Sequence, residues 1–264
     1  MKIKLFFLFV IFFVIFLLAG CGARQSTAET QDLIVFAASS LTDAFNELAE
    51  TFEAQNPGVQ IVLNFASSSQ LAAQLSEGAA ADIYASANPA QMQAVIDAGR
   101  IKASTDVPFV SNRLTVIVPA DNPAGITALE DLTRPGIKLV LAVDGVPVRE
   151  YTDEIVAAMT ADFQAAFYSN LVSEEDNVRQ VSAKIALGEA DAGIVYTSDV
   201  TPDIADQVRQ ITIPDDQNVI ATYPIAPITD ASHPELAQKF IDFILSQEGQ
   251  NILARWSFDP PTTN

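Results

Sequence analysis

The stretch LIVFAASSLTDAFNELAETFEA, residues 33–54, decides the fold. Its first four residues are apolar and typical of a buried strand, and small residues follow them directly. From residue 41 to residue 54 the apolar side chains recur at helical spacing, which predicts an amphipathic helix. The stretch therefore joins a strand directly to a helix, which is the building unit of α/β proteins.

The same alternation continues along the chain. Apolar, strand-like runs occupy residues 59–65, 82–84, 114–118, 138–143 and 193–196, and amphipathic segments occupy residues 71–75, 91–98, 150–159 and 179–187. This order predicts α/β architecture with largely parallel sheets. One doubly wound sheet and two separate lobes fit the pattern equally well, so the pattern leaves the number of lobes open.

The first 20 residues are typical of an export signal. MKIK is basic, residues 5–18 are an unbroken apolar run, and Leu-Ala-Gly precedes Cys21, the sole cysteine. The run is shorter than the ~20 residues of a membrane-spanning helix. Because the segment resembles a bacterial lipobox, we expect cleavage of residues 1–20 and lipidation of Cys21; a retained N-terminal membrane anchor is the alternative. Residues 21–31 are then a flexible tether.

The chain is strongly acidic, with 14 Lys and Arg against 33 Asp and Glu and a net charge of −19. Loss of residues 1–20 removes Lys2 and Lys4, so 12 basic minus 33 acidic residues leaves −21. This charge argues against nucleic acid as a partner. An anion site in such a protein would have to be built from local dipoles rather than from net positive charge.

Four predicted helices begin directly after a strand or loop, at Ser40, Ser68, Val148 and Val178. The first turn of a helix has unpaired N–H groups and partial positive charge, so convergent N-termini can bind an anion without Lys or Arg. A single serine before a helix is more simply an N-cap. We keep that interpretation for Ser39 and Ser69.

From residue 33 to residue 258, the chain resembles the periplasmic molybdate-binding protein family. The matching stretches are FAASSLTDAF (36–45), FASSSQLAAQL (65–75), GAAADIYASANPAQM (78–92), NPAGITALEDLTRPGIKLVLA (122–142), VPVREYT (146–152), EDNVRQVSAKIALGEADAGIVYTSD (175–199) and YPIA (223–226). The resemblance implies an α/β, two-lobed periplasmic binding protein (type II) fold with a hinge and an interlobe ligand cleft. Lobe 1 is expected to comprise residues 32–111 and 225–264, and lobe 2 residues 112–224.

The resemblance also implies the ligand contacts. They fall on the hydroxyl and N–H groups of Ser40 and Ser68, the N–H groups of Val148 and Val178, and the hydroxyl of Tyr196. Neutral donors suit an oxyanion that is fully deprotonated at pH 7, because it only accepts hydrogen bonds. We expect molybdate or tungstate, which the residues do not rank, and no cofactor; molybdenum would enter only as the oxyanion. Another tetrahedral oxyanion such as sulfate, or a small organic acid, is the alternative, since a fold does not fix its ligand.

The resemblance further implies the partners and the location. The protein is expected to be a monomer outside the cytoplasm, held at the membrane by the lipid on Cys21. Its lobes would close on the ligand, and the closed form would deliver it to the permease and ATPase of an ABC importer.

Two arginines follow predicted ligand-contact residues. Arg149 departs from the resemblance, because the family commonly has a small residue after the position of Val148. A charged side chain in the cleft would add a contact to the oxyanion and blur selectivity. We expect both Arg149 and Arg179 to point into solvent.

Two other classes of function lack support. An enzyme would need partners for its serines, but the sole histidine, His233, precedes a proline at an expected surface turn, and no G-x-S-x-G elbow is present. A metal-binding lipoprotein would need a ligand cluster, and the mature chain has neither further histidines or cysteines nor a D-x-D-x-D-G loop. The acidic run 174–176 is expected to be a solvated face.

Overall fold

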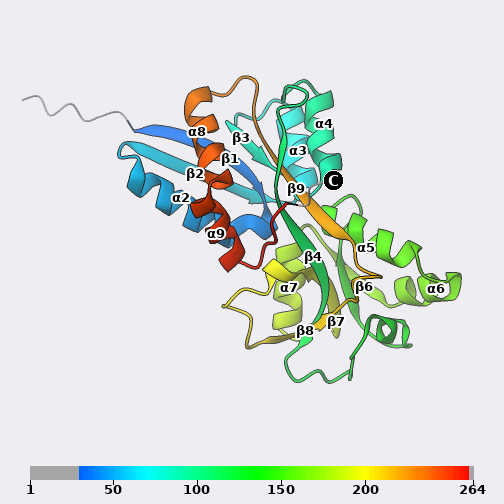
Figure 1. Cartoon of the computed structure of the whole chain (residues 1–264). Coiled ribbons are helices and arrows are strands. Elements are labelled where there is room, and N and C mark those ends of the chain that lie inside the picture. Colours follow the sequence, from blue (N-terminus) through cyan, green and yellow to red (C-terminus); the bar gives the residue numbers. More distant parts are fainter. Residues whose placement is uncertain (1–29, 262–264) are drawn as a thin grey trace, which may run out of the picture. The chain divides into compact units, whose positions relative to one another are not determined.

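The computed structural model describes residues 30–261 (Figure 1). The expected signal, Cys21 and nearly all of the tether therefore lie outside the described residues. The elements run β1 (Gln31–Ala38), η1 (Ser39–Leu41), α2 (Thr42–Gln55), β2 (Val59–Ala66), α3 (Ser68–Ser76), β3 (Ile83–Ala85), α4 (Pro89–Asp97), β4 (Val107–Pro119), η2 (Leu129–Thr133), β5 (Leu139–Ala142), α5 (Pro147–Ala157), α6 (Ala161–Ser169), β6 (Leu171–Glu175), α7 (Val178–Ala186), β7 (Ala192–Tyr196), η3 (Thr197–Asp199), β8 (Val208–Thr212), β9 (Ile220–Pro227), α8 (Pro234–Leu245) and α9 (Gln247–Arg255). This order confirms the α/β prediction.

The strands form two half-sheets that share one strand. The first half-sheet has the order β2-β1-β3-β9-β4, and in the second β4 pairs with β7 and β8, followed by β5 and β6. Residues 107–113 of β4 pair with β9, whereas residues 114–119 pair with β7 and β8. One continuous strand thus belongs to both half-sheets, as Figure 1 shows.

The expectation of largely parallel sheets is only partly right. The pairs β1–β2, β1–β3, β5–β6 and β5–β7 are parallel, but every pair that contains β4 or β9 is antiparallel. Parallel neighbours are joined by helical crossovers, and β4 and β9 instead run in opposite directions at the centre of the order. The sheets are therefore mixed.

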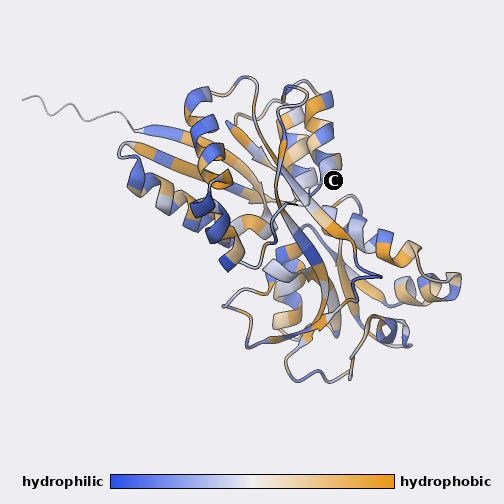
Figure 2. Cartoon of the chain, in the orientation of Figure 1, coloured by the Kyte–Doolittle hydropathy of each residue, from blue (hydrophilic) through white to orange (hydrophobic). Residues whose placement is uncertain are grey.

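Helices cover both half-sheets with their apolar sides. Helix α2 contacts β1, β2, α8 and α9, and α7 contacts β4, β5, β6 and β7. Figure 2 shows the hydrophobic colour concentrated along the strands, while the helices carry hydrophilic colour on their other sides. Phe52 packs edge-on against Phe240, with ring centroids 5.0 Å apart, and this contact joins α2 to α8. Among residues 30–261, no helix is both long and apolar enough to cross a bilayer.

The acidic run 174–176 was expected to be a solvated face, and this is only partly right. Two of its residues, at the end of β6, form ion pairs. Glu174 accepts from Arg149 Nη1 at 2.6 Å, and Glu175 lies 2.5 Å from Lys184 Nζ. The strand LVSEE has too few apolar residues to stand out by periodicity. It forms because β5 offers it a parallel partner.

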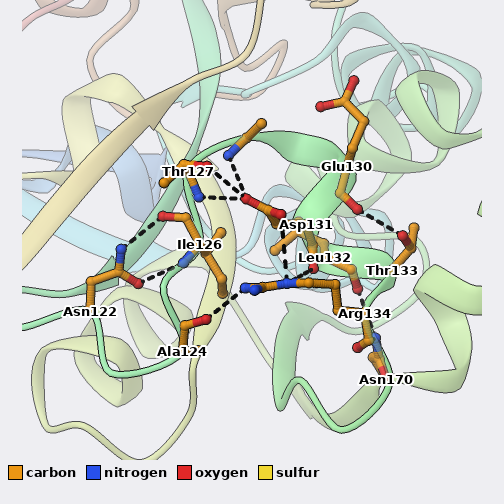
Figure 3. A network of polar contacts seen from close by, with 11 residues as sticks. Asn122, Ala124, Ile126, Thr127, Glu130, Asp131, Leu132, Thr133, Arg134 and Asn170 are labelled. Atoms are coloured by element: carbon orange, nitrogen blue, oxygen red, sulfur yellow. Dashed lines mark hydrogen bonds and ion pairs between the residues drawn. The ribbon is translucent and has the colours of Figure 1, made fainter.

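A polar network fixes the turn before β5 (Figure 3). The carboxylate of Asp131 accepts from the backbone N–H groups of Thr127 (2.7 Å) and Ala128 (3.2 Å), and from the Thr127 hydroxyl (2.9 Å). These donors hold the pKa of Asp131 below its usual value. Asn170 closes the turn from α6 by donating to the carbonyl groups of Leu132 and Arg134, each at 2.8 Å. The turn is thereby tied to the second half-sheet.

Candidate functional site

A small cavity lies where strand ends meet helix starts from both half-sheets. It is lined by Ala38, Ser39, Ser40, Ser67, Ser68, Ala87, Val146, Pro147, Val148, Val178 and Tyr196. The five residues predicted to contact the ligand, Ser40, Ser68, Val148, Val178 and Tyr196, are all in this set. Ligands of open α/β sheets commonly bind outside the carboxyl ends of strands, and β1, β2 and β7 all end here. The structure therefore brings the whole predicted set together.

Four of these residues are in the first turn of a helix. Ser40 is the second residue of η1, Ser68 the first of α3, Val148 the second of α5, and Val178 the first of α7. An N–H group at such a position has no carbonyl one turn before it within its helix. None of the four is bonded to a carbonyl group of the described turns and loops. They are free donors with the partial positive charge of a helix N-terminus.

Capping is done by neighbours of these residues rather than by the residues themselves. Ser67, not Ser68, caps α3: its hydroxyl accepts from the N–H group of Gln70 at 3.3 Å. Asn177 caps α7 through Gln180 N–H at 3.2 Å. The side chain of Ser69 only contacts Ser67, 3.2 Å between hydroxyls, in keeping with a local role. The hydroxyl of Ser68 is thus left for other contacts.

Both predicted serine hydroxyls are oriented by buried groups. Ser68 Oγ accepts from the N–H group of Ala87 at 2.9 Å, so its proton remains free to be donated. Ser40 Oγ lies 3.0 Å from the hydroxyl of Tyr223, a residue 183 positions away on β9. Burial raises the pKa of Tyr223 well above its usual value, so this hydroxyl keeps its proton and can donate to Ser40.

Tyr196 contributes the most informative atom. Its side chain is 1% exposed and lines the cavity, and its hydroxyl oxygen is buried without a hydrogen-bond partner among residues 30–261. Burial raises the pKa of Tyr196 well above 10, so the group is a neutral donor at pH 7. A buried hydroxyl without a partner costs about 1–3 kcal/mol, and a ligand that accepts a hydrogen bond would remove this cost.

The two arginines do not line the cavity, but both expectations of a solvent-facing side chain are wrong. Arg149 is 12% exposed, because its guanidinium pairs with Asp153 (2.8 Å) and Glu174 (2.6 Å) and lies over the ring of Tyr168. Arg179 is 24% exposed and contacts two carboxylates. Asp153 is an i,i+4 partner of Arg149 on α5, whereas Glu174, Asp43 and Asp199 are distant in sequence, and no local pattern reveals them.

The cavity is neutral and small. Of the described residues, those that line it carry no charged side chain. The space open to the centre of a water molecule is only ≈10 Å³. Such a space suits a compact ligand held by hydrogen-bond donors. Within residues 30–261, no group of three His, Cys, Asp or Glu side chains is placed to hold a metal ion.

Sequence reasoning did not assign Ser67, Ala87 or Tyr223 to the site. Ser67 lies within the matching stretch 65–75 and Ala87 within the stretch 78–92, so each had a weak signal. Ser39 was expected only to cap or shape its turn, but it lines the cavity. The contact between Tyr223 and Ser40 depends on how β9 packs, and no motif predicts it.

Comparisons with known proteins agree with this geometry. Residues 33–259 match the family described as bacterial extracellular solute-binding protein. The molybdate-binding protein ModA of Mycobacterium tuberculosis is 37% identical over 251 residues, which cover 92% of this chain and 93% of that protein. Among solved structures, the sulfate-binding protein SubI of M. tuberculosis superposes with a TM-score of 0.80 at 20% identity, covering 87% of each chain.

The periplasmic molybdate-binding protein of Azotobacter vinelandii superposes with a TM-score of 0.76 at 16% identity, covering 87% of this chain and 100% of that one. At these identities the two structures show the fold alone. The family match over residues 33–259 and the 37% identity show kinship of sequence as well. The chain therefore belongs to the bacterial extracellular solute-binding proteins, in the family of the molybdate-binding proteins, and is not an enzyme.

Proposed function

We propose that this protein captures molybdate, and tungstate with it, in the cavity lined by Ser40, Ser68, Val148, Val178 and Tyr196. The observation that carries the proposal is the buried Tyr196 hydroxyl, which lacks a partner among the described residues in a cavity of free N–H donors. A fully deprotonated tetrahedral oxyanion accepts from every one of these donors. A protonated phosphate fits less well, because the N–H groups cannot accept its proton and a hydroxyl oxygen would have to turn from donor to acceptor.

The two half-sheets suggest how the ligand would be delivered. We propose that they are the cores of two lobes, residues 32–111 with 225–264 and residues 112–224, which close about β4 and β9. Both boundaries fall inside these two strands, which pair with each other. The closed form would then dock on the permease of an ABC importer, with an ATPase behind it.

The location is extracytoplasmic, as the family description implies. We further propose that the mature protein is a monomer anchored by a lipid on Cys21, because this cysteine follows the small residues of the expected cleavage site. Anchoring would raise the concentration of the loaded protein near its transporter.

Calorimetric titration of a soluble form that begins after Cys21 tests the ligand. Molybdate, tungstate, sulfate and phosphate are each titrated into the wild type and into Ser68→Ala. We expect 1:1 binding of molybdate and tungstate alone, weakened in the variant. Heat with only sulfate or phosphate, or with none of the four, would mean that the ligand is a different anion or a small organic acid.

A further inference from the structure

Arg179 connects elements on both sides of the cavity. Its Nη2 lies 2.6 Å from Asp43 Oδ2, and its Nε lies 3.0 Å from Asp199 Oδ1. Asp43 is in the first turn of α2, which packs on the first half-sheet, whereas Asp199 ends η3, which follows β7 of the second. Arg179 itself is the second residue of α7 on the second half-sheet. The Asp43–Arg179 ion pair therefore crosses from one half-sheet to the other.

Arg179, Asp43 and Asp199 each lie near a proposed ligand contact. Arg179 directly follows Val178, and Asp43 comes three residues after Ser40. The other carboxylate oxygen of Asp199 accepts from the backbone N–H group of Tyr196 at 3.0 Å. One guanidinium thus joins three segments that each hold or directly adjoin one of the proposed contacts Ser40, Val178 and Tyr196.

The two carboxylates have different roles because their surroundings differ. Asp199 is fully buried on the same side as Arg179, and its Oδ1 approaches Arg179 Nε at an angle that does not form a hydrogen bond. Because both groups lie on the second half-sheet, their charge attraction would orient the guanidinium in an open form as well. Asp43, 27% exposed, lies on the other half-sheet and is the partner that would move away if the half-sheets separated. A pre-oriented arginine loses less side-chain entropy when it forms the second contact.

We propose that Arg179 is a positioning residue for oxyanion capture, which holds the two sides of the cavity together through Asp43 and so slows release of the ligand. The inference rests on the proposed function and adds to it a residue that does not touch the ligand. Arg179 acts on the spacing of the donors, because Ser40 and Ser68 come from one half-sheet and Val148, Val178 and Tyr196 from the other.

Arg149 is a matched control within the same chain. It too follows a proposed N–H donor, Val148, in the first turn of a helix. Its carboxylate partners Asp153 and Glu174 lie on α5 and β6, and its Nη1 donates to the carbonyl group of Ala142 on β5 at 3.1 Å. All of these elements belong to the second half-sheet. Loss of Arg149 removes an ion-pair network of similar kind without loosening any contact across the cavity.

The test measures dissociation of molybdate by stopped flow in Asp43→Asn, Arg179→Gln, the double variant and Arg149→Gln. We expect each of the first two to release the ligand about 10-fold faster, as found for ion pairs that are partly desolvated. The double variant should be no faster than either single variant, because both remove the same contact. Arg149→Gln should stay within about 2-fold of the wild type, as expected for contacts that do not reach the ligand. Asp43→Asn keeps the buried Asp199–Arg179 pair, so it remains informative if Arg179→Gln folds poorly.

The outcomes separate this inference from the proposed function. Wild-type binding with unchanged release in Asp43→Asn overturns the role of Arg179 and leaves the function intact. If the wild type binds none of the four anions, the bridge can be tested without ligand. Distance probes are attached to cysteines introduced by Ala94→Cys on α4 and Ala165→Cys on α6, two exposed positions, and the distance between the probes measures the separation of the two sides. A shift to longer distances in Asp43→Asn, but not in Arg149→Gln, then supports the bridge, and identical distances overturn it.

Discussion

At the scale of single residues, the hydroxyl of Tyr196 separates a binding role from a structural one. A hydroxyl that stabilises the fold has a protein partner, and its removal lowers stability by about 1 kcal/mol. The Tyr196 hydroxyl has no such partner among the described residues, although the ring itself is packed against Tyr223 with centroids 5.7 Å apart. The residue therefore uses its ring for the core and its hydroxyl for the cavity.

Tyr196→Phe is predicted to weaken molybdate binding by about 10- to 100-fold, because hydrogen bonds to charged groups contribute about 1.5–3 kcal/mol. The melting temperature of the free protein should stay the same or rise, since the variant buries one fewer polar group. Calorimetry and thermal unfolding check the two halves of the prediction. Tyr168→Phe is the control, because its hydroxyl bonds to Asp153 at 2.5 Å, outside the cavity lining. Equal losses of affinity in both variants would contradict the prediction.

At the scale of an element, η3 depends on a carboxylate with an unusual environment. Burial raises the pKa of Asp199 to about 6, against the opposing effects of Arg179 and the Tyr196 N–H group. The folded protein therefore binds this proton more tightly than the unfolded chain does. Between about pH 4 and pH 6, the contribution of Asp199 to the free energy of unfolding falls as the pH rises.

Asp199→Asn removes this dependence. We predict that the free energy of unfolding of the variant, relative to the wild type, improves by about 2 kcal/mol between pH 4 and pH 7, because most of the rise of the pKa from 3.8 to about 6 takes effect in this range. Urea denaturation of both proteins across this range gives the difference, in which the other carboxylates largely cancel. A difference that stays constant with pH would show that Asp199 titrates normally.

The position of α7 depends on a glycine in β7. A Cβ atom added to Gly193 would lie 2.8 Å from Val181 Cγ1 and 3.2 Å from the carbonyl oxygen of Val140, closer than normal packing allows. Gly193→Ala should therefore lower the free energy of unfolding by about 1–3 kcal/mol and, by displacing α7 and its first residue Val178, weaken ligand binding.

Chemical denaturation and calorimetry measure both effects of Gly193→Ala. Gly188→Asn, just after the end of α7, is the control: it has a φ of 71° and open space around it, and asparagine tolerates this conformation. The prediction fails if Gly193→Ala is as stable as this control.

At the scale of the whole molecule, the strongly negative net charge contrasts with the uncharged lining of the cavity. The expected mature chain carries −21, yet the cavity is lined by neutral groups. The overall field repels a dianion before the helix N-termini attract it at short range. Salt screens the long-range part more than the short-range part.

We therefore predict that molybdate associates faster as the ionic strength rises from about 0.01 to 0.15 M, where the screening length shrinks from about 30 to 8 Å. Stopped-flow association rates across this range provide the measurement. A rate that falls with salt would indicate a positively charged entrance and would contradict a site built from dipoles alone.

The proposed lipid anchor can also be tested in the whole chain. Cys21→Ser should abolish incorporation of labelled palmitate and leave residues 1–20 attached, because the expected lipid and the expected cleavage both depend on this cysteine. We expect the unprocessed variant to migrate more slowly on a gel. Unchanged size and membrane association in the variant would favour the retained N-terminal anchor instead.

Local order in the sequence was enough for much of the fold. Residues 33–54 predicted β1 and α2 because an apolar run and a helical period are each complete within a few residues, and η1 was the only addition. The strand β6 was missed, because its sequence LVSEE owes its conformation to pairing with β5 rather than to an apolar pattern. Residues at helix starts were predicted for the same local reason, and the family resemblance identified those that meet in the cavity.

The sequence by itself determined most of the elements, the acidic charge and the family, since each depends on neighbouring residues or on composition. Only the tertiary structure decided that Ser40 meets Tyr223, that β4 belongs to both half-sheets, and that Arg179 joins Asp43 to Asp199. These features pair groups up to 183 positions apart, and Arg149 and Arg179, which look alike in sequence, differ in whether they cross the cavity. Contacts of this kind arise when half-sheets pack, because buried charges and hydroxyls must then find partners wherever the chain has placed them.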